Sequence, residues 1–342
     1  MGEIQLTVLL ATRNGAHVLP RTLGGYRCVA APTFGWKLVV VDNGSTDATP
    51  EILKSFETHL PLQVLHQPVP GKNRSLNVGI RHAEGSLVVL TDDDAIPHPS
   101  FLTAWAKFLN IRTDYELFGG SIEPLFDVPP PKWLMKSRLH FAMMFAERLL
   151  PDGPVAPDEI YGPNLAVRLS VTKRGFRFDE RLGPDTSNPD YPCGGETEFC
   201  KRVARSGARC WFASEPKVQH IVRSAQLTAA AWARRAYRLG CARAIEYWDQ
   251  TTEETWQHPS QHDRFRDFYR RIYTQLAMLS PLPIQRHIAR GFRDQWARQE
   301  RNRYGTRTND VKNDVHGEGE RVTGVHAGND GFECNENGPS SN

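Results

Sequence analysis

The sequence predicts an α/β protein with a mostly parallel, helix-covered sheet. Short β-branched apolar runs alternate with segments of helical periodicity, several of these runs end abruptly in polar residues, and a basic, helix-rich stretch follows them. Parallel strands buried on both faces appear as such apolar runs, and the helices between them cover the sheet. With 342 residues, of which 39% are hydrophobic, the chain can build a substantial core.

The alternating pattern defines the expected elements in order. A proline in the first turn supports the helix that begins at Thr49. The apolar runs predict strands and the spaced apolar residues predict helices. The expected elements are a strand at 5–11, a helix from 18, a strand at 37–41, a helix from 49, a strand at 63–66, a helix at 75–83, a strand at 86–90, a helix at 101–105, a strand at 118–122, a helix at 133–150, a proline-rich loop that leads to 161–167, and a strand-like segment at 217–219.

Three consecutive carboxylates, Asp92, Asp93 and Asp94, follow the strand at 86–90. Ligands of open α/β sheets gather beyond the carboxyl ends of the strands. Adjacent acids repel one another, and a divalent cation with hard oxygen ligands relieves that repulsion. The triplet therefore predicts a metal site that holds a diphosphate; a solvated acidic turn is the alternative.

Polar residues also end the first two strands, and they would share this sheet edge. The first strand ends in Thr12, Arg13 and Asn14, and the second in Asp42. Asp42 can accept hydrogen bonds from a base or ribose, or it can simply form a turn.

Two basic residues follow the third strand. Lys72 and Arg74 can offset the charge of a phosphate. Together with the polar strand ends they predict one crevice for a phosphate-bearing substrate.

A second acidic cluster opens a helix after a pair of glycines. Glu196 lies at the helix start, where the helix dipole would stabilise it in a purely structural role. Its functional alternative is a general base that removes the proton of an acceptor hydroxyl. Glu198 lies about 200° around the helix from Glu196, so the two cannot serve one site equally.

His220 follows a strand-like segment, and its neutral imidazole would complete an oxygen-rich metal shell. A structural histidine is the alternative. His258 and His262 lie four residues apart, but Pro259 favours a loop there over a metal site.

Charge is unevenly distributed along the chain. The net charge of +3 is too small to indicate a nucleic-acid partner, but residues 217–303 hold sixteen Lys or Arg against eight Asp or Glu. These basic helices predict either peripheral membrane contact or a solvated face. The few apolar residues after 304 predict a disordered tail.

The sequence also bears on location. The first residues do not resemble a secretory signal, and no apolar run approaches the roughly 18 residues of a membrane span. Six cysteines without a Cys-x-x-Cys pair indicate neither a zinc nor a disulfide framework. We expect a cytoplasmic protein, in peripheral contact with the inner face of the membrane through its basic helices.

Several of these motifs, taken in order, closely resemble glycosyltransferase family 2. The matching segments are 8–14, 39–47, 71–80, 90–94, 162–168, 194–199 and His220, within residues 4–245. The resemblance implies a GT-A fold, in which a nucleotide-sugar half and an acceptor half share a continuous sheet. It further implies an inverting enzyme that needs a divalent metal, Mn²⁺ or Mg²⁺.

The resemblance also assigns roles residue by residue. Thr12 and Asp42 match nucleotide contacts, Asp92 matches the acid near the ribose, and Asp94 and His220 match the metal ligands. The full predicted set is Glu196 as catalytic base; Thr12, Arg13, Asn14, Asp42, Lys72, Arg74, Asn77, Asp92 and Asp93 as donor-binding residues; Asp94 and His220 as metal ligands; and Asn164 and Glu198 as acceptor-binding residues.

The chain departs from the family pattern at the base. The family usually has Glu-Asp where this chain has Glu196 and Thr197 or Gly195 and Glu196, depending on the alignment. Either alignment leaves Glu196 as the available carboxylate, and we favour the one that keeps the following residues, through Phe199, in register.

The resulting hypothesis is an inverting transfer of a sugar from a nucleotide diphosphate sugar to a hydroxyl of a glycan or lipid-linked acceptor, in polysaccharide or glycoconjugate biosynthesis. A nucleotidyltransferase is one alternative, although the first strand lacks a glycine-rich phosphate loop. A catalytically inactive scaffold is another. The expected organisation is a GT-A domain at 1–222, divided into donor (1–123) and acceptor (124–222) halves, a basic helical extension at 223–303 and the tail at 304–342.

Overall fold

The computed structural model describes residues 3–135, 144–249, 278 and 283–315, with side chains described up to residue 302. Met1–Ala297 forms one compact unit and Arg298–Asn342 a second. The domain divisions at 123 and 222 fall inside the first unit and stay predictions.

The first half of the chain alternates strands and helices as the sequence predicts, except that a short strand that was not predicted, β5, follows β4 directly. Its elements are β1 (Ile4–Thr12), α1 (Leu19–Arg27), β2 (Gly35–Asp42), α2 (Thr49–Phe56), β3 (Leu62–His66), α3 (Lys72–Ile80), β4 (Leu87–Leu90), β5 (Ala95–Pro97), α4 (Phe101–Lys107) and β6 (Leu117–Phe126). The second half adds α5 (Lys132–Met135), β7 (Gly153–Pro154), the 3₁₀ turns η2 (Pro157–Glu159) and η3 (Gly162–Asn164), β8 (Leu165–Arg168), α7 (Leu169–Lys173), α8 (Gly195–Arg205), β9 (Cys210–Val222), η4 (Ser224–Leu227), α9 (Ala229–Asp249) and α12 (Pro283–Val315).

The strands of the described residues form one mixed sheet in the order β3-β2-β1-β4-β8-β6-β9-β5, with β7 paired to β9. The β3–β2, β2–β1 and β1–β4 pairs are parallel, whereas β8 is antiparallel to both β4 and β6. The carboxyl ends of β1, β2 and β4 therefore meet at one edge, as expected of parallel strands. β6 and β9 are also parallel, whereas β5 and β7 run antiparallel to β9, so four of the eight pairings among these strands are parallel. The arrangement confirms the predicted mixed α/β sheet with flanking helices.

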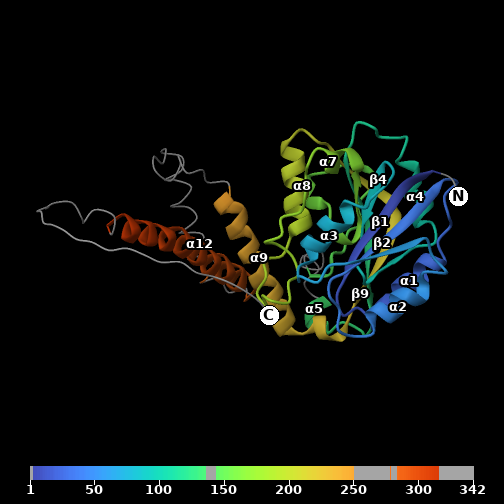
Figure 1. Cartoon of the computed structure of the whole chain (residues 1–342). Coiled ribbons are helices and arrows are strands. Elements are labelled where there is room, and N and C mark those ends of the chain that lie inside the picture. Colours follow the sequence, from blue (N-terminus) through green and yellow to red (C-terminus); the bar gives the residue numbers. More distant parts are fainter. Residues whose placement is uncertain (1–2, 136–143, 250–277, 279–282, 316–342) are drawn as a thin grey trace, which may run out of the picture. The chain divides into compact units, whose positions relative to one another are not determined.

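Helices cover both faces of this sheet (Figure 1). Alternate residues of β1 point to opposite faces, with Val8 and Leu10 on one side and Leu9 on the other. The first face packs against α1, α2 and α4, with Trp105 fully buried. The second packs against α3, α7 and α8, with Phe199 fully buried. Two hydrophobic cores thus hold the sheet edge rigidly.

β9 contains a bulge that matters for the site. Its pairing with β6 runs in register up to Gly120 opposite Ala213, and resumes with Ser121 opposite Lys217. Beyond the bulge, His220 lies opposite Ala95 of the antiparallel β5. The bulge therefore determines which residue of β9 lies beside the end of the acidic triplet.

The segment predicted as a helix at 133–150 is not one helix. α5 ends at Met135, residues 136–143 lie outside the described residues, and Arg148 forms an antiparallel bridge with Ile122 of β6. Pro151 follows this bridge. Pairing with an available strand therefore outweighs the helical spacing of the apolar residues.

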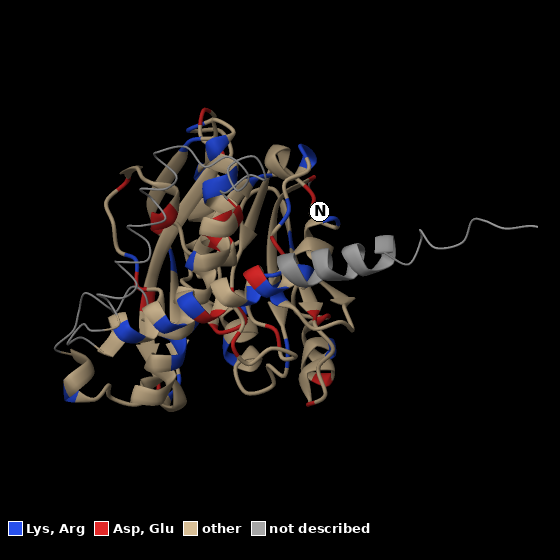
Figure 2. Cartoon of the chain, turned by 90° about the vertical axis from the view of Figure 1, so that its left-hand side faces the viewer, with Lys and Arg blue, Asp and Glu red and all other residues tan. Residues whose placement is uncertain are grey.

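Helices follow the sheet, as predicted for the basic extension. Figure 2 shows both basic and acidic positions on the helices that face the viewer. α12 continues to Val315, beyond the boundary at 304 predicted for the tail, because no proline after its first residue and few glycines interrupt this segment. Residues 316–342, His258 and His262 lie outside the described residues. None of the described helices has the length and apolar character required to cross a bilayer.

Candidate active site

A cavity of about 930 Å³ opens at the edge where the parallel strands end. Its lining includes Thr12 at the end of β1, the acids that follow β4, Glu196 of α8 and His220 of β9. The structure thus brings together residues that are up to about two hundred positions apart in the sequence. Other predicted residues on the lining are Arg13, Asn14, Lys72 and Glu198.

Asp92, Asp94 and His220 each offer one ligand atom, and these three atoms lie within 4.8 Å of one another. His220 Nε2 is 3.2 Å from Asp94 Oδ1, while His220 Nδ1 is 2.9 Å from the carbonyl oxygen of Phe145. Nδ1 donates to this carbonyl, so Nε2 faces the carboxylates. A histidine held in this way is typical of metal ligands, and two carboxylates with one imidazole suit Mn²⁺.

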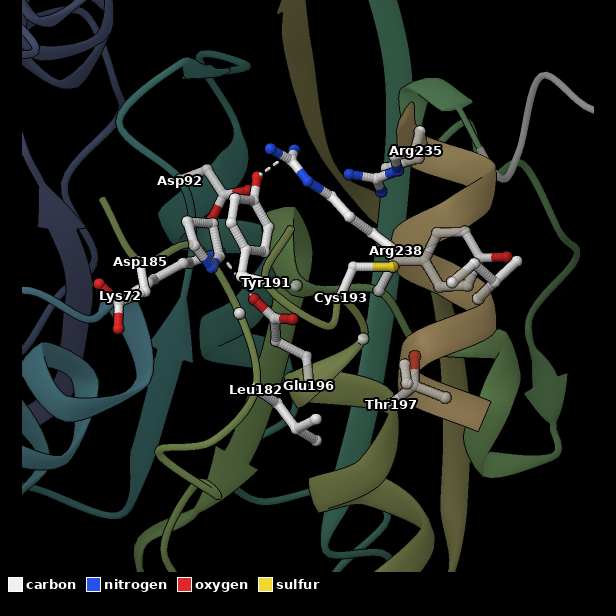
Figure 3. A pocket seen from close by; sticks show the side chains of 18 of the residues that line it. Lys72, Asp92, Leu182, Asp185, Tyr191, Cys193, Glu196, Thr197, Arg235 and Arg238 are labelled. Atoms are coloured by element: carbon white, nitrogen blue, oxygen red, sulfur yellow. Dashed lines mark hydrogen bonds and ion pairs between the residues drawn. The ribbon is translucent and has the colours of Figure 1, made fainter. Parts of the chain in front are cut away.

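Lys72 connects the acidic triplet to Glu196. Its Nζ donates to Asp92 Oδ1 at 2.6 Å and to Glu196 Oε1 at 2.7 Å, and all three side chains are at most one-fifth exposed. Lys72 is the first residue of α3, so the helix start places its ammonium group between the two carboxylates. Figure 3 shows Lys72, Asp92 and Glu196 converging in the cavity.

The acids of the site differ in their electrostatic surroundings. Burial raises the pKa of Asp92, and burial together with the charge of Asp94 raises the pKa of Asp93 to about 7. Burial also disfavours ionisation of Asp94 and Glu196, but His220 and Lys72 respectively outweigh it, so the pKa of each of these two carboxyls is lowered. Glu196 is therefore ionised at neutral pH, as a general base must be.

His220 shows the complementary shift. Burial alone would lower its pKa, but the carboxylate of Asp94 outweighs burial and raises it.

Asp93 lies outside the group of Asp92, Asp94 and His220: its Oδ2 accepts a 2.6 Å hydrogen bond from the Thr12 hydroxyl. The triplet thus provides two ligand candidates and one acid that is bonded to the end of β1.

A loop from Gly183 to Gly194 forms part of the lining and precedes Glu196. Both terminal glycines have a positive φ, 91° for Gly183 and 88° for Gly194, which residues other than glycine rarely adopt. The loop is closed by a hydrogen bond from Gly183 N to Pro192 O at 2.7 Å. Arg238 of α9 holds it by donating to Pro189 O at 2.6 Å and to Tyr191 Oη at 2.8 Å (Figure 3).

Four predicted site residues do not line the cavity. Three of them, Asp42, Arg74 and Asn77, make polar contacts within the fold. The Asp42 carboxylate accepts from Ser45 N at 3.0 Å, which is the turn-forming alternative. Arg74 pairs with Glu180 at 2.9 Å, and both amide atoms of Asn77 bond the backbone of Phe178.

Asn164, the fourth, was predicted to bind the acceptor and is fully buried instead. Its Nδ2 donates to Ser121 O at 3.0 Å and to Pro216 O at 2.9 Å, while its Oδ1 accepts from Trp105 Nε1. Each of these polar groups is satisfied inside the fold, because an unpaired buried amide would be costly. The Asn164 side chain therefore fixes the β9 bulge.

Several residues of the cavity lie outside the predicted set. Tyr161, Tyr191, Arg235 and Arg243 line it and were not predicted. The cluster of arginines in α9 was a usable signal, because Arg235, Arg238 and Arg243 lie three and five residues apart, but the sequence does not indicate which face of the helix meets the cavity. Glu198, predicted on the acceptor side, does line the cavity but pairs with Arg202 at 2.7 Å.

Comparisons with known proteins bear on the family and on the fold. Residues 7–172 match the family model described as Glycosyl transferase family 2. The glycosyltransferase AglE of Haloferax volcanii is 26% identical over 212 residues, covering 61% of this chain and 64% of AglE. The chondroitin synthase of Escherichia coli is 27% identical over 219 residues, covering 61% of this chain and 30% of that protein. The chain thus spans less than two thirds of either relative.

Solved structures share the fold. The mannosyltransferase PcManGT of Pyrobaculum calidifontis, in complex with GDP-Man and Mn²⁺, superimposes with a TM-score of 0.55 at 19% identity, covering 85% of this chain and 86% of that one. Residues 1–349 of TarS from S. aureus give a TM-score of 0.50 at 15% identity, covering 88% and 92%. These similarities confirm the predicted GT-A fold with a helical C-terminal region.

Proposed function

Because residues 7–172 belong to glycosyl transferase family 2, we propose that this chain transfers a sugar from a nucleotide diphosphate sugar to an acceptor hydroxyl with inversion at the anomeric carbon. One observation carries the proposal: a carboxylate suited to be a base, Glu196, shares a cavity with the group of Asp92, Asp94 and His220. A base can activate the acceptor, and a metal ion is one means of stabilising the charge on the leaving diphosphate, so both functions would be served in one site.

Glu196 acts on the acceptor in this proposal. Its carboxylate takes the proton of the acceptor hydroxyl, and the acceptor oxygen forms a bond to the anomeric carbon. The bond from that carbon to the diphosphate oxygen breaks, and its electron pair leaves with the nucleoside diphosphate. Lys72 keeps Glu196 ionised for this step, because its charge outweighs the effect of burial.

Asp92, Asp94 and His220 would hold a divalent metal ion. The bound ion supplies Lewis-acid stabilisation of negative charge on the diphosphate. The fit rests on the ligand types and on the orientation of His220 by Phe145 O. Mn²⁺ is the ion in the complex of PcManGT, and we propose Mn²⁺ or Mg²⁺ for this chain.

Arg13 is a further donor-binding candidate. It lines the cavity, and its Nε is buried with no hydrogen-bond partner among the described residues. A diphosphate oxygen would satisfy this donor. The glycan or lipid-linked nature of the acceptor and a role in polysaccharide or glycoconjugate biosynthesis belong to the same proposal.

The proposal is tested by incubating the protein with a panel of nucleotide sugars, with Mn²⁺ or with a chelator, and measuring released nucleoside diphosphate. We expect release from at least one donor, and loss of that release on chelation. NMR of the transferred sugar then gives its anomeric configuration. Retention of configuration, or no release from any donor, contradicts the proposal.

Replacing Lys72 with methionine is expected to move the pH profile of turnover. Removal of the ammonium group takes away the largest of the effects that oppose burial of Glu196, so the pKa of that carboxyl rises and the acid limb of kcat shifts to higher pH. A purely structural lysine would lower the melting temperature without moving this limb. Thermal unfolding measured beside the pH profile separates the two roles.

Replacing Gly162 with alanine is expected to displace the base. An added Cβ would lie 2.6 Å from Glu196 Oε1 and 2.7 Å from its Cδ, so the carboxylate must move. A shift of about 1 Å in a reacting group can lower kcat by up to about 10²-fold. Gly24→Ala in α1 is the matched control, because nothing lies within 4 Å of its added Cβ, and we expect it to keep wild-type turnover. Equal turnover of the two variants contradicts the placement of Glu196.

A further inference from the structure

One face of α9 lines the cavity. The lining residues on this helix follow helical spacing, and three of them are arginines. They are Arg235, Arg238, Leu239, Ala242, Arg243, Ile245, Glu246 and Asp249. Figure 3 shows Arg235 and Arg238 extending from this helix toward the cavity. α9 follows residues 7–172, so these side chains are additional to the family-matched part of the site.

The two acids on this face are already neutralised. Glu246 pairs with Lys201 of α8 at 3.0 Å and lies 3.7 Å from Arg205, and Asp249 pairs with Arg181 at 2.5 Å. Their charges are therefore compensated by residues from other elements.

The charge of Arg238 is not compensated in this way. Its hydrogen bonds within the described residues go to the uncharged Pro189 O and Tyr191 Oη, and its guanidinium lies 3.8 Å from the Tyr191 ring centroid. Arg243 is exposed and makes no hydrogen bond or ion pair with any residue that the structure describes. A guanidinium stays charged at every physiological pH, so this face presents positive charge to the cavity.

Arg235 connects this face to the proposed base. Its charge contributes to lowering the pKa of Glu196 and acts on Tyr161 in the same direction. Arg235 therefore lies within electrostatic reach of the group that would contact the acceptor hydroxyl. This location favours the acceptor over the donor as the molecule that α9 meets.

We propose that Arg235, Arg238 and Arg243 bind an anionic group of the acceptor, a phosphate or a carboxylate, while its hydroxyl meets Glu196. This inference rests on the proposed function and adds the chemical class of the acceptor. Guanidinium groups match the geometry of both anions, often through two parallel hydrogen bonds. The anion belongs either to a soluble acidic sugar or to a lipid carrier.

Arg243→Gln tests the proposal, because no hydrogen bond or ion pair between described residues is lost with this side chain. Arg234→Gln is the matched control: Arg234 lies on the same helix, about 100° around from Arg235, and does not line the cavity. Calorimetry would measure binding of glucose 6-phosphate, glucuronic acid and uncharged methyl glucoside. A parallel arm would use detergent micelles with and without a polyprenyl phosphate.

We expect the wild-type protein and Arg234→Gln to bind the charged probes more tightly than methyl glucoside, and Arg243→Gln to lose about tenfold of that affinity. Preferential binding of glucose 6-phosphate or glucuronic acid identifies a soluble acceptor. Preferential binding of the micelles that contain the polyprenyl phosphate identifies a lipid carrier. Equal binding of charged and uncharged probes, no binding of any probe, or equal loss in both variants overturns the proposal.

Kinetics separate this inference from the proposed function. With a donor that the wild-type protein uses, Arg243→Gln should raise the KM of a charged acceptor more than that of an uncharged one. Transfer that does not discriminate between the two acceptors overturns the inference and leaves the transferase intact. No nucleoside diphosphate release from any donor overturns the proposed function, and the acceptor role of α9 with it.

Discussion

Glu196→Gln is expected to lower kcat by about 10²- to 10⁴-fold, the range that a positioned general base contributes. The amide keeps the shape of the side chain and can still accept a hydrogen bond from Lys72 Nζ, but it cannot take the proton of an acceptor hydroxyl. Steady-state transfer with a saturating donor measures the effect. The KM of the donor should change little, because the metal-ligand candidates are untouched.

Glu215→Gln provides the control for this variant. Glu215 undergoes the same chemical change but forms an ion pair with Lys107 on the surface, with side chains about half exposed. Exposed pairs of this kind contribute little to stability. Near-normal turnover of Glu196→Gln, or an equal loss in both variants, contradicts the assignment of the base.

Asp94→Asn is expected to remove most of the metal-dependent activity, a loss of roughly 10³-fold if the metal supplies several kcal/mol of charge stabilisation. The substitution removes one carboxylate from the group of three and the partner of His220 Nε2. Nucleoside diphosphate release as a function of Mn²⁺ concentration, with direct Mn²⁺ binding followed by electron paramagnetic resonance, would measure both consequences.

Asp93→Asn makes the same chemical change one residue earlier. Burial raises the pKa of Asp93 to about 7, so this group is already substantially neutral at pH 7, and it lies outside the group of metal-ligand candidates. We expect a loss below about tenfold, in line with one altered hydrogen bond to Thr12. Losses of equal size at the two positions contradict the separate roles of these acids.

Strand periodicity allowed most of the fold to be predicted, because a strand buried on both faces has few alternatives. β1, β2, β3 and β4 lie within two residues of their predicted bounds. The convergence of Thr12 with the acidic triplet follows from parallel pairing alone. The stretch at 133–150 differs because Arg148 pairs with Ile122 of β6. The spacing of apolar residues within the stretch contains no information on such a partner.

The site was predictable in part at strand ends and at helix starts: Thr12, Lys72 and Glu196 line the cavity. The carboxylate of Asp42, also at a strand end, forms a turn instead. A polar side chain further along a helix can meet solvent, a backbone group or a cavity. Asn77 and Asn164 bond backbone groups from distant segments, and neither contact is encoded in local spacing. The arginines of α9 show the converse: the helix is predictable, but the face that meets the cavity depends on how α9 packs.

The bulge of β9 gives Asn164 a role that reaches the metal-ligand candidates. Its amide donates to Ser121 O of β6 and to Pro216 O within the bulge of β9, and so helps to fix how many residues of β9 are looped out before pairing resumes. A slip of one residue would turn His220 to the opposite face of the sheet and bring Gln219 or Ile221 opposite Ala95. One buried amide, which does not itself line the cavity, therefore sets the register of the strand that carries the third ligand candidate.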